Sequence, residues 1–157
     1  MKLFEIFKTA ETSISASKYP GADIFQFSLN GVDYIIQFLH MSASHPLYGM
    51  MRRKPSLTDN SYFFAFAASV NGEMTDKDID MGDSIVVFSH VIQLLVKYVH
   101  EHNVDQLILG CDDGHEKRKR IYQKIVSKYT RSYGWFEEFT TITNYMGPKF
   151  TWVLAKK

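Results

Sequence analysis

Apolar residues between Gly82 and Trp135 follow a pattern that predicts two helices separated by a short strand. From about residue 83 to 102 they recur every three or four positions, the period that gathers side chains on one face of a helix. The residues of this stripe are Ile85, Phe88, Val91, Ile92, Leu95, Tyr98 and Val99.

The segment from Gln106 to Cys111 is short and apolar, which predicts a buried strand. A second amphipathic helix follows, with Asp113 as its N-cap and Glu116 as the reciprocal partner of a capping box. Gly134 is expected to close it, because glycine adopts the left-handed conformation that often ends a helix. A helix needs a sheet face to bury its apolar stripe, so this order predicts an α/β layer.

Predicted strands lie before and after this helix–strand–helix unit in the sequence. The runs 24–29 and 32–39 meet at Asn30-Gly31, the strongest short-range signal for a β-hairpin. The nearly continuous apolar run 62–70 predicts a central strand covered on both faces, with Asn71-Gly72 turning into a short partner. Two last strands are expected at 136–143 and 150–154.

The remaining segments carry weaker patterns. Residues 3–18 fit a short helix or an edge strand, with helix favoured, and 41–60 read as a polar loop. The sequence therefore predicts one α/β (α+β) domain over residues 1–157. Its sheet is expected to be mixed and mostly antiparallel, with about six or seven strands, and to carry helices on both faces.

Composition narrows the class of protein further. The 157 residues are 45% hydrophobic and 22% charged, which is typical of a soluble globular protein. The single cysteine, Cys111, excludes an internal disulfide and favours a reducing compartment. The first residues lack the apolar run of a signal peptide, and no stretch is long and apolar enough for a membrane span. A cytoplasmic protein is expected.

The order of hairpin, central strand, long helix, strand, basic helix and two strands resembles the GNAT superfamily of N-acetyltransferases. The resemblance covers the topology of roughly residues 23–157, and is closest to small bacteriophage-encoded GNAT-like proteins. It implies that the strand after the long helix splays away to admit the pantetheine of acyl-coenzyme A. It also implies a tyrosine on the second helix that protonates the leaving thiolate. Tyr122 of Lys119-Arg120-Ile121-Tyr122 matches that tyrosine, and Gly134-Trp135 resembles the closing glycine-phenylalanine.

In the same resemblance, the start of the long helix holds the coenzyme pyrophosphate through backbone N–H groups. Aligning Gly82 with the first glycine of the superfamily loop makes Gly82, Asp83 and Ser84 the cofactor-binding residues for acetyl-coenzyme A. The loop is degenerate, because Ile79 stands where the superfamily has Gln or Arg. Asp80 and Asp83 add like charge beside the anion. The sequence therefore leaves acyltransferase activity open.

Other residues that could carry chemistry also have structural interpretations. Tyr122 could simply pack with Ile125 and Tyr129, and His90 or His115 could act as a base but is more often structural. The spacing of Asp76, Asp78, Asp80 and Asp83 lacks the glycine and terminal glutamate of a calcium loop, so these residues are better explained as favouring a helix N-terminus. Cys111 reads as packing, and Asp112 and Asp113 are only a weak magnesium pattern. No metal site is predicted.

The second helix carries a stripe of positive charge within an arc of roughly 80°. It consists of Lys117, Arg120, Lys124, Lys128 and Arg131, to which Arg52, Arg53 and Lys54 could add. Such a stripe could be a solvated face, yet like charges at helical spacing repel one another. It could instead bind an acidic protein or a nucleic acid. This is the rival hypothesis: a non-catalytic binding or inhibitory module, encoded by a phage and acting in the host cytoplasm.

Overall fold

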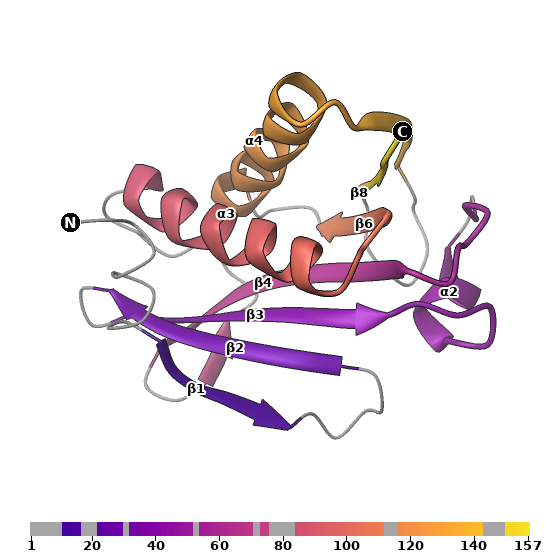
Figure 1. The fold of residues 1–157 in the computed structure, drawn as a ribbon. Helices are drawn as coiled ribbons and strands as arrows, with labels where there is room; N and C mark the ends of the chain where they lie inside the picture. The colour runs from indigo at the N-terminus through magenta and orange to yellow at the C-terminus, as the bar shows by residue number, and fades with distance from the viewer. Residues whose placement is uncertain are drawn as a thin grey trace.

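An eight-stranded sheet is the framework of the computed structural model (Figure 1). The structure describes residues 11–16, 22–29, 32–51, 54–70, 73–75, 84–111, 116–142 and 150–157. The strands lie in the order β1-β2-β3-β4-β6-β8-β7, and β5 pairs with β4. All described pairs are antiparallel except β4 with β6. The strands are β1 (Glu11–Ala16), β2 (Ala22–Leu29), β3 (Val32–His40), β4 (Ser61–Val70), β5 (Glu73–Thr75), β6 (Gln106–Cys111), β7 (Phe136–Ile142) and β8 (Phe150–Ala155).

Helices cover both faces of this sheet, as predicted. Helices α3 (Ser84–Glu101) and α4 (Glu116–Ser132) pack on one face, where their apolar stripes join Phe64 and Leu109 in the larger core cluster. The short helix α2 (Pro46–Met50) packs its Leu47 and Tyr48 against the opposite face, over Phe63 and Ile108. Neighbouring residues of one strand therefore serve different cores, because side chains alternate across a sheet.

The strand and hairpin predictions are confirmed. β2 and β3 pair antiparallel with Leu29 opposite Val32, the register expected around Asn30-Gly31. β4 lies between β3 and β6 in the middle of the sheet, which explains its continuous apolar sequence. The mixed, mostly antiparallel α+β class is confirmed as well.

Two local predictions were wrong. Residues 11–16, which fell in the segment where a helix was favoured, form the edge strand β1, held by pairing with β2. The polar loop 41–60 contains α2, which begins with Pro46 and is capped by His45, whose Nδ1 accepts from the Leu47 N–H at 3.1 Å. The edge strand β1 brings the strands to eight, above the expected six or seven.

The apolar stripe of α3 is buried along most of its predicted length. Val91, Leu95 and Tyr98 are buried, whereas Ile85 in the first turn is 68% exposed. Phe88 is only partly buried, with the Lys124 Nζ of α4 lying 5.7 Å from its ring centroid. Helical spacing identified the correct face, but the core covers only the residues that lie over the sheet.

Candidate active site

The parallel strands β4 and β6 stay together for only part of their length. Residues Ser61–Phe64 of β4 pair with Gln106–Leu109 of β6, and the pairing stops there. Further along the same edge, β4 pairs with β5 from Ala68 onward. The edge of β4 therefore has a gap at Phe66, between two strand partners.

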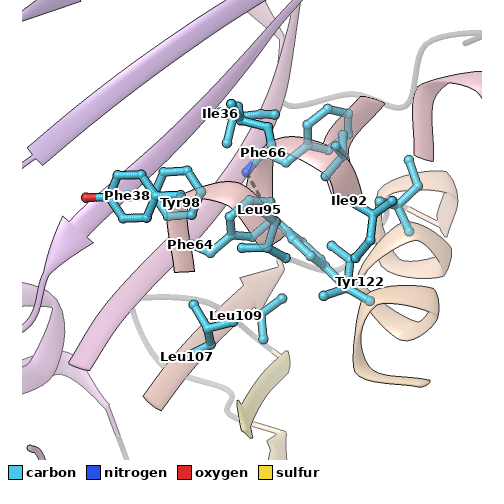
Figure 2. Packing of buried hydrophobic residues seen from close by; sticks show 14 of the residues in the cluster. Ile36, Phe38, Phe64, Phe66, Ile92, Leu95, Tyr98, Leu107, Leu109 and Tyr122 are labelled. Carbon is cyan, nitrogen blue, oxygen red and sulfur yellow. Dashed lines mark hydrogen bonds between the residues drawn. The ribbon is translucent and has the colours of Figure 1, made fainter. Parts of the chain in front are cut away.

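A side chain from α4 fills this gap. The backbone N–H of Phe66 donates a hydrogen bond to Tyr122 Oη at 3.0 Å, drawn as the dashed line in Figure 2. A strand N–H that faced the interior without an acceptor would cost about 1–3 kcal/mol. Tyr122 thus replaces the missing strand partner at the point where β4 and β6 part.

The apolar face of α4 fixes Tyr122 in this position. Its ring lies edge-on to Phe64 at a centroid distance of 5.9 Å and is 6.0 Å from Trp152. Ile121 and Ile125 pack beside it, and the Tyr122 side chain is 1% exposed. The prediction that Tyr122 packs against the sheet is confirmed, and its catalytic role stays a prediction.

The pair formed by Phe66 and Tyr122 has the groups that acyl transfer needs. A backbone N–H held at a fixed point can stabilise negative charge on a carbonyl oxygen. A phenol can donate a proton to a leaving group. A tyrosine hydroxyl that accepts a hydrogen bond can also donate one, so accepting from Phe66 does not use the hydrogen of the Tyr122 hydroxyl.

The other end of the β4–β6 pair is locked by buried polar side chains. Ser61 Oγ donates to Gln106 Oε1 at 2.5 Å, and Gln106 Nε2 donates to the Ser56 carbonyl at 3.1 Å. Gln106 Nε2 also lies 3.3 Å from Glu138 Oε1 of β7. Ser61 and Gln106 are both buried and directly opposite each other, so this network sets the register of the two strands.

Part of the predicted coenzyme site lies outside the described residues. This holds for Gly82 and Asp83, while Ser84 is described only as the first residue of α3. Arg52, Arg53 and His115 also lie outside, and the side chain of Lys117 is not described. The phosphate-binding role of residues 82–84 remains a prediction.

The rest of the basic stripe lies on the surface of α4. Arg120, Lys124, Lys128 and Arg131 are exposed, and within the described parts of the chain none of the four pairs with a carboxylate. An open groove of about 260 Å³ runs between α3 and α4. Its lining consists of Phe88, Lys124, Ser127, Lys128, Arg131 and Ser132.

One of the two candidate bases, His90, lies in the core as a structural residue. His90 is buried, its Nδ1 lies 2.9 Å from the Val86 carbonyl, and its ring stacks on Phe27.

Across the residues that the structure describes, no three His, Cys, Asp or Glu side chains come together to hold a metal ion. Among the described helices, none is long and apolar enough to cross a membrane.

Comparison with known proteins identifies the fold. No family model matches the sequence, and no curated protein matches it. The solved structure of AAC(6')-Ib in complex with ribostamycin and coenzyme A superposes over 87% of this chain, with a TM-score of 0.55 at 12% identity. The fold is that of the GNAT acetyltransferases. This chain spans 65% of the length of that enzyme.

Two further structures of the same aminoglycoside acetyltransferase support this conclusion. One holds acetyl-coenzyme A and the other coenzyme A with kanamycin, and both superpose with a TM-score of 0.52 over 87% of this chain. Identities of 12% and 13% mean that the likeness is one of fold. In this chain β4 and β6 part after Phe64 and Leu109, and Tyr122 of α4 lies beside that point.

Some residues of this region give little or no signal in the sequence. Phe66 contributes a backbone group, so its side chain gives no signal. Ser61 and Gln106 are single polar residues in apolar strands, a pattern that could have indicated a buried hydrogen-bonded pair. Their partnership spans 45 residues and depends on the parallel register.

Proposed function

We propose that this protein is an N-acyltransferase that moves an acyl group from acyl-coenzyme A to an amine in the gap between β4 and β6. The observation that carries this proposal is the hydrogen bond from the Phe66 N–H to Tyr122 Oη at the register where the strands part. The fold likeness to acetyltransferase structures that contain coenzyme A or acetyl-coenzyme A supports the choice of cofactor.

The described residues fit the reacting end of this coenzyme. A hydrogen-bond donor and a phenol meet at one point, which suits a thioester carbonyl and its sulfur leaving group. Gly82, Asp83 and Ser84 would hold the pyrophosphate at the start of α3. When bound, acetyl-coenzyme A supplies an acyl group already activated as a thioester.

In the mechanism, Phe66 and Tyr122 have separate tasks. The Phe66 N–H would stabilise the negative charge that develops on the carbonyl oxygen as a neutral amine attacks. Tyr122 would donate its proton to the sulfur as the carbon–sulfur bond breaks, and the proton that the amine nitrogen loses on forming the amide would restore the Tyr122 hydroxyl. For the first task Tyr122 Oη must release the Phe66 N–H, because a single N–H cannot be directed fully at two acceptors.

The degenerate loop predicts weak coenzyme binding. Ile79 gives no hydrogen bond to phosphate, and Asp80 and Asp83 repel it. We therefore expect dissociation constants in the range of about 0.1–1 mM, well above those of a tightly held cofactor.

Calorimetric titration with acetyl-coenzyme A is the first test, followed by thiol release in the presence of primary amines. We expect binding, and a rate that falls by about 10²-fold in Tyr122→Phe with little change in affinity. Tyr129→Phe is the matched control, because Tyr129 is a buried tyrosine of the same helix and the described residues offer its hydroxyl no partner. Absence of heat and of any thermal shift at millimolar coenzyme would refute the proposal.

A second candidate function follows from the exposed cations of α4. In it the GNAT fold has lost its coenzyme and serves, as a phage-encoded binding or inhibitory module, to hold an acidic protein or nucleic acid. The observation that favours it is the groove beside Phe88, whose described rim carries Lys124, Lys128 and Arg131 without a carboxylate.

A triple variant tests this second function. Lys124→Glu, Lys128→Glu and Arg131→Glu together should abolish binding to the polyanion while changing stability by less than about 1 kcal/mol, since these side chains are exposed. Wild-type binding to nucleic acid should fall steeply between about 50 and 200 mM salt, whereas a protein partner would show a shallower dependence. If the triple variant binds as well as the wild type does, the stripe is only a solvated face.

A further inference from the structure

A cavity of about 250 Å³ lies between the beginning of β2 and the C-terminal half of α3. It is separated from the gap at Tyr122 by packed aromatic rings. Tyr98, which lines the cavity, stacks on Phe38 at 3.8 Å, and Phe64 lies between Phe38 and Tyr122. In Figure 2 the Tyr98 hydroxyl points away from Phe64 and Tyr122. The cavity is thus a second region, distinct from the proposed acyl-transfer site.

Apolar and aromatic groups form one part of the lining of this cavity. Its lining includes Phe25, Leu94 and the ring of Tyr98, and the Phe25 ring meets the Tyr98 ring edge-on at 6.0 Å. Leu94 and Tyr98 are buried, while Phe25 is partly exposed. These groups offer a surface for carbon atoms and an aromatic ring that can attract a cation.

A fixed carboxylate stands at the edge of this apolar surface. Tyr98 Oη donates to Asp23 Oδ2 at 2.6 Å, which holds an otherwise mobile side chain in one orientation. Burial, and then the hydrogen bond and charge of Asp23, raise the pKa of Tyr98, so this donor stays protonated at neutral pH. No donor from the described parts of the chain reaches Asp23 Oδ1.

The remaining charged groups of the rim do not neutralise Asp23 strongly. His102 Nε2 lies 3.9 Å from Asp23 Oδ2, longer than a hydrogen bond. Lys97 forms an exposed pair with Glu101, the second carboxylate of the rim, at 3.9 Å. Such exposed pairs contribute little, so a ligand ammonium can compete for Glu101.

We propose that this cavity binds a small organic cation, a primary ammonium carried on a short carbon chain or ring. The ammonium binds the open oxygen of Asp23, and the carbon body packs on Phe25 and Leu94. This proposal does not depend on the acyltransferase function, because it uses no residue of the gap at Tyr122.

Benzylammonium, titrated in the absence of coenzyme and followed by backbone amide resonances, tests the proposal. Saturable shifts are expected around Asp23 and Tyr98, with phenylacetate binding at least tenfold more weakly. Asp23→Asn keeps an oxygen that can accept from Tyr98 but removes the charge, so we expect it to weaken benzylammonium binding about tenfold. Lys97→Gln removes a repelling charge and should tighten binding about two- to threefold.

Glu137→Gln, which changes an exposed carboxylate of β7, is the matched control and should leave the affinity unchanged. Any one of the following results would overturn the proposal. Benzylammonium and phenylacetate could bind equally, Asp23→Asn could bind like the wild type, or no saturable shift could occur near Asp23 at tens of millimolar probe. Saturable shifts confined to the Tyr122 gap would also overturn it, and would instead indicate an amine at the acyl-transfer site.

Discussion

The two ends of the β4–β6 pair use buried polar side chains for opposite purposes. At the end beginning with Ser61 and Gln106, side chains bond across the two strands and to the Ser56 carbonyl. At the other end, the Tyr122 hydroxyl of α4 accepts a hydrogen bond from the Phe66 N–H, in the place where a strand carbonyl would accept it. Several side-chain bonds hold the first end together, and the hydrogen bond from Phe66 to Tyr122 occupies the second.

This difference shows how one sheet can be rigid and still offer a place for a ligand. The network at Ser61 fixes which residues of β4 and β6 face each other, and therefore where the pairing ends. Exchanging the single bond at Phe66 for a bond to ligand requires no strand to be unpaired. Substitutions at the locked end, with Ser61 and Gln106, should therefore affect folding. Substitutions at the open end, with Phe66 and Tyr122, should affect function.

The largest effect on stability should come from the locked end. Gln106→Leu keeps the volume but leaves the Ser56 carbonyl without this donor and Ser61 without this acceptor, which should cost about 3 kcal/mol in unfolding free energy. Gln123→Leu is the matched control at an exposed position of α4 and should change stability by less than about 0.5 kcal/mol. Urea unfolding measures both. Equal values would show that the network does not hold the strands.

A smaller effect is expected at the open end. Tyr122→Phe leaves the buried Phe66 N–H without its acceptor and should lower the free energy of unfolding by about 1–2 kcal/mol. Tyr129→Phe removes a hydroxyl that has no acceptor or donor in the described residues, so it should be neutral or slightly stabilising. Thermal unfolding of the two variants side by side distinguishes them. If Tyr129→Phe proved the more harmful, the role given to the Phe66 bond would be wrong.

The smallest effect concerns alkaline pH. Burial, and then the neighbouring Tyr133, raise the pKa of Tyr129 above its ordinary value of 10.0. Between the unfolded and folded pKa values the unfolded chain binds fewer protons, so stability is complete below pH 10 and falls as the pH rises. At pH 10.5 this group should contribute a loss of about 0.8 kcal/mol, which Tyr129→Phe should remove. Urea unfolding at pH 8 and pH 10.5 checks it, and an identical loss in the variant would contradict it.

Much of this fold could be predicted from the sequence because its signals are local. The helical period of α3, the Asn30-Gly31 turn and the apolar run of β4 each lie within one segment. Gly134 was identified as the end of α4 by residue type alone, and its φ of 74° agrees. The strand at 11–16 was the less favoured of two interpretations because an edge strand depends on its pairing with β2 and has little apolar pattern of its own.

Only one of the two groups of the candidate site could be predicted from the sequence. The resemblance to GNAT enzymes pointed to Tyr122, and helical spacing placed it on the buried face of its helix, where the structure has it. Its partner could not be identified, because nearly every residue has a backbone N–H. The Phe66 N–H is distinctive only because the β4–β6 pairing ends beside it. The bond between Asp23 and Tyr98 was likewise hidden, as it joins residues 75 positions apart.

The backbone amide resonance of Phe66 during titration with acetyl-coenzyme A tests the central claim most directly. If the coenzyme binds in the gap, Tyr122 Oη gives up the Phe66 N–H to the ligand, and this resonance should shift among the most strongly of all. The shift should saturate together with the calorimetric binding curve. Binding that leaves Phe66 unchanged, or no change in any resonance at millimolar coenzyme, would contradict the account.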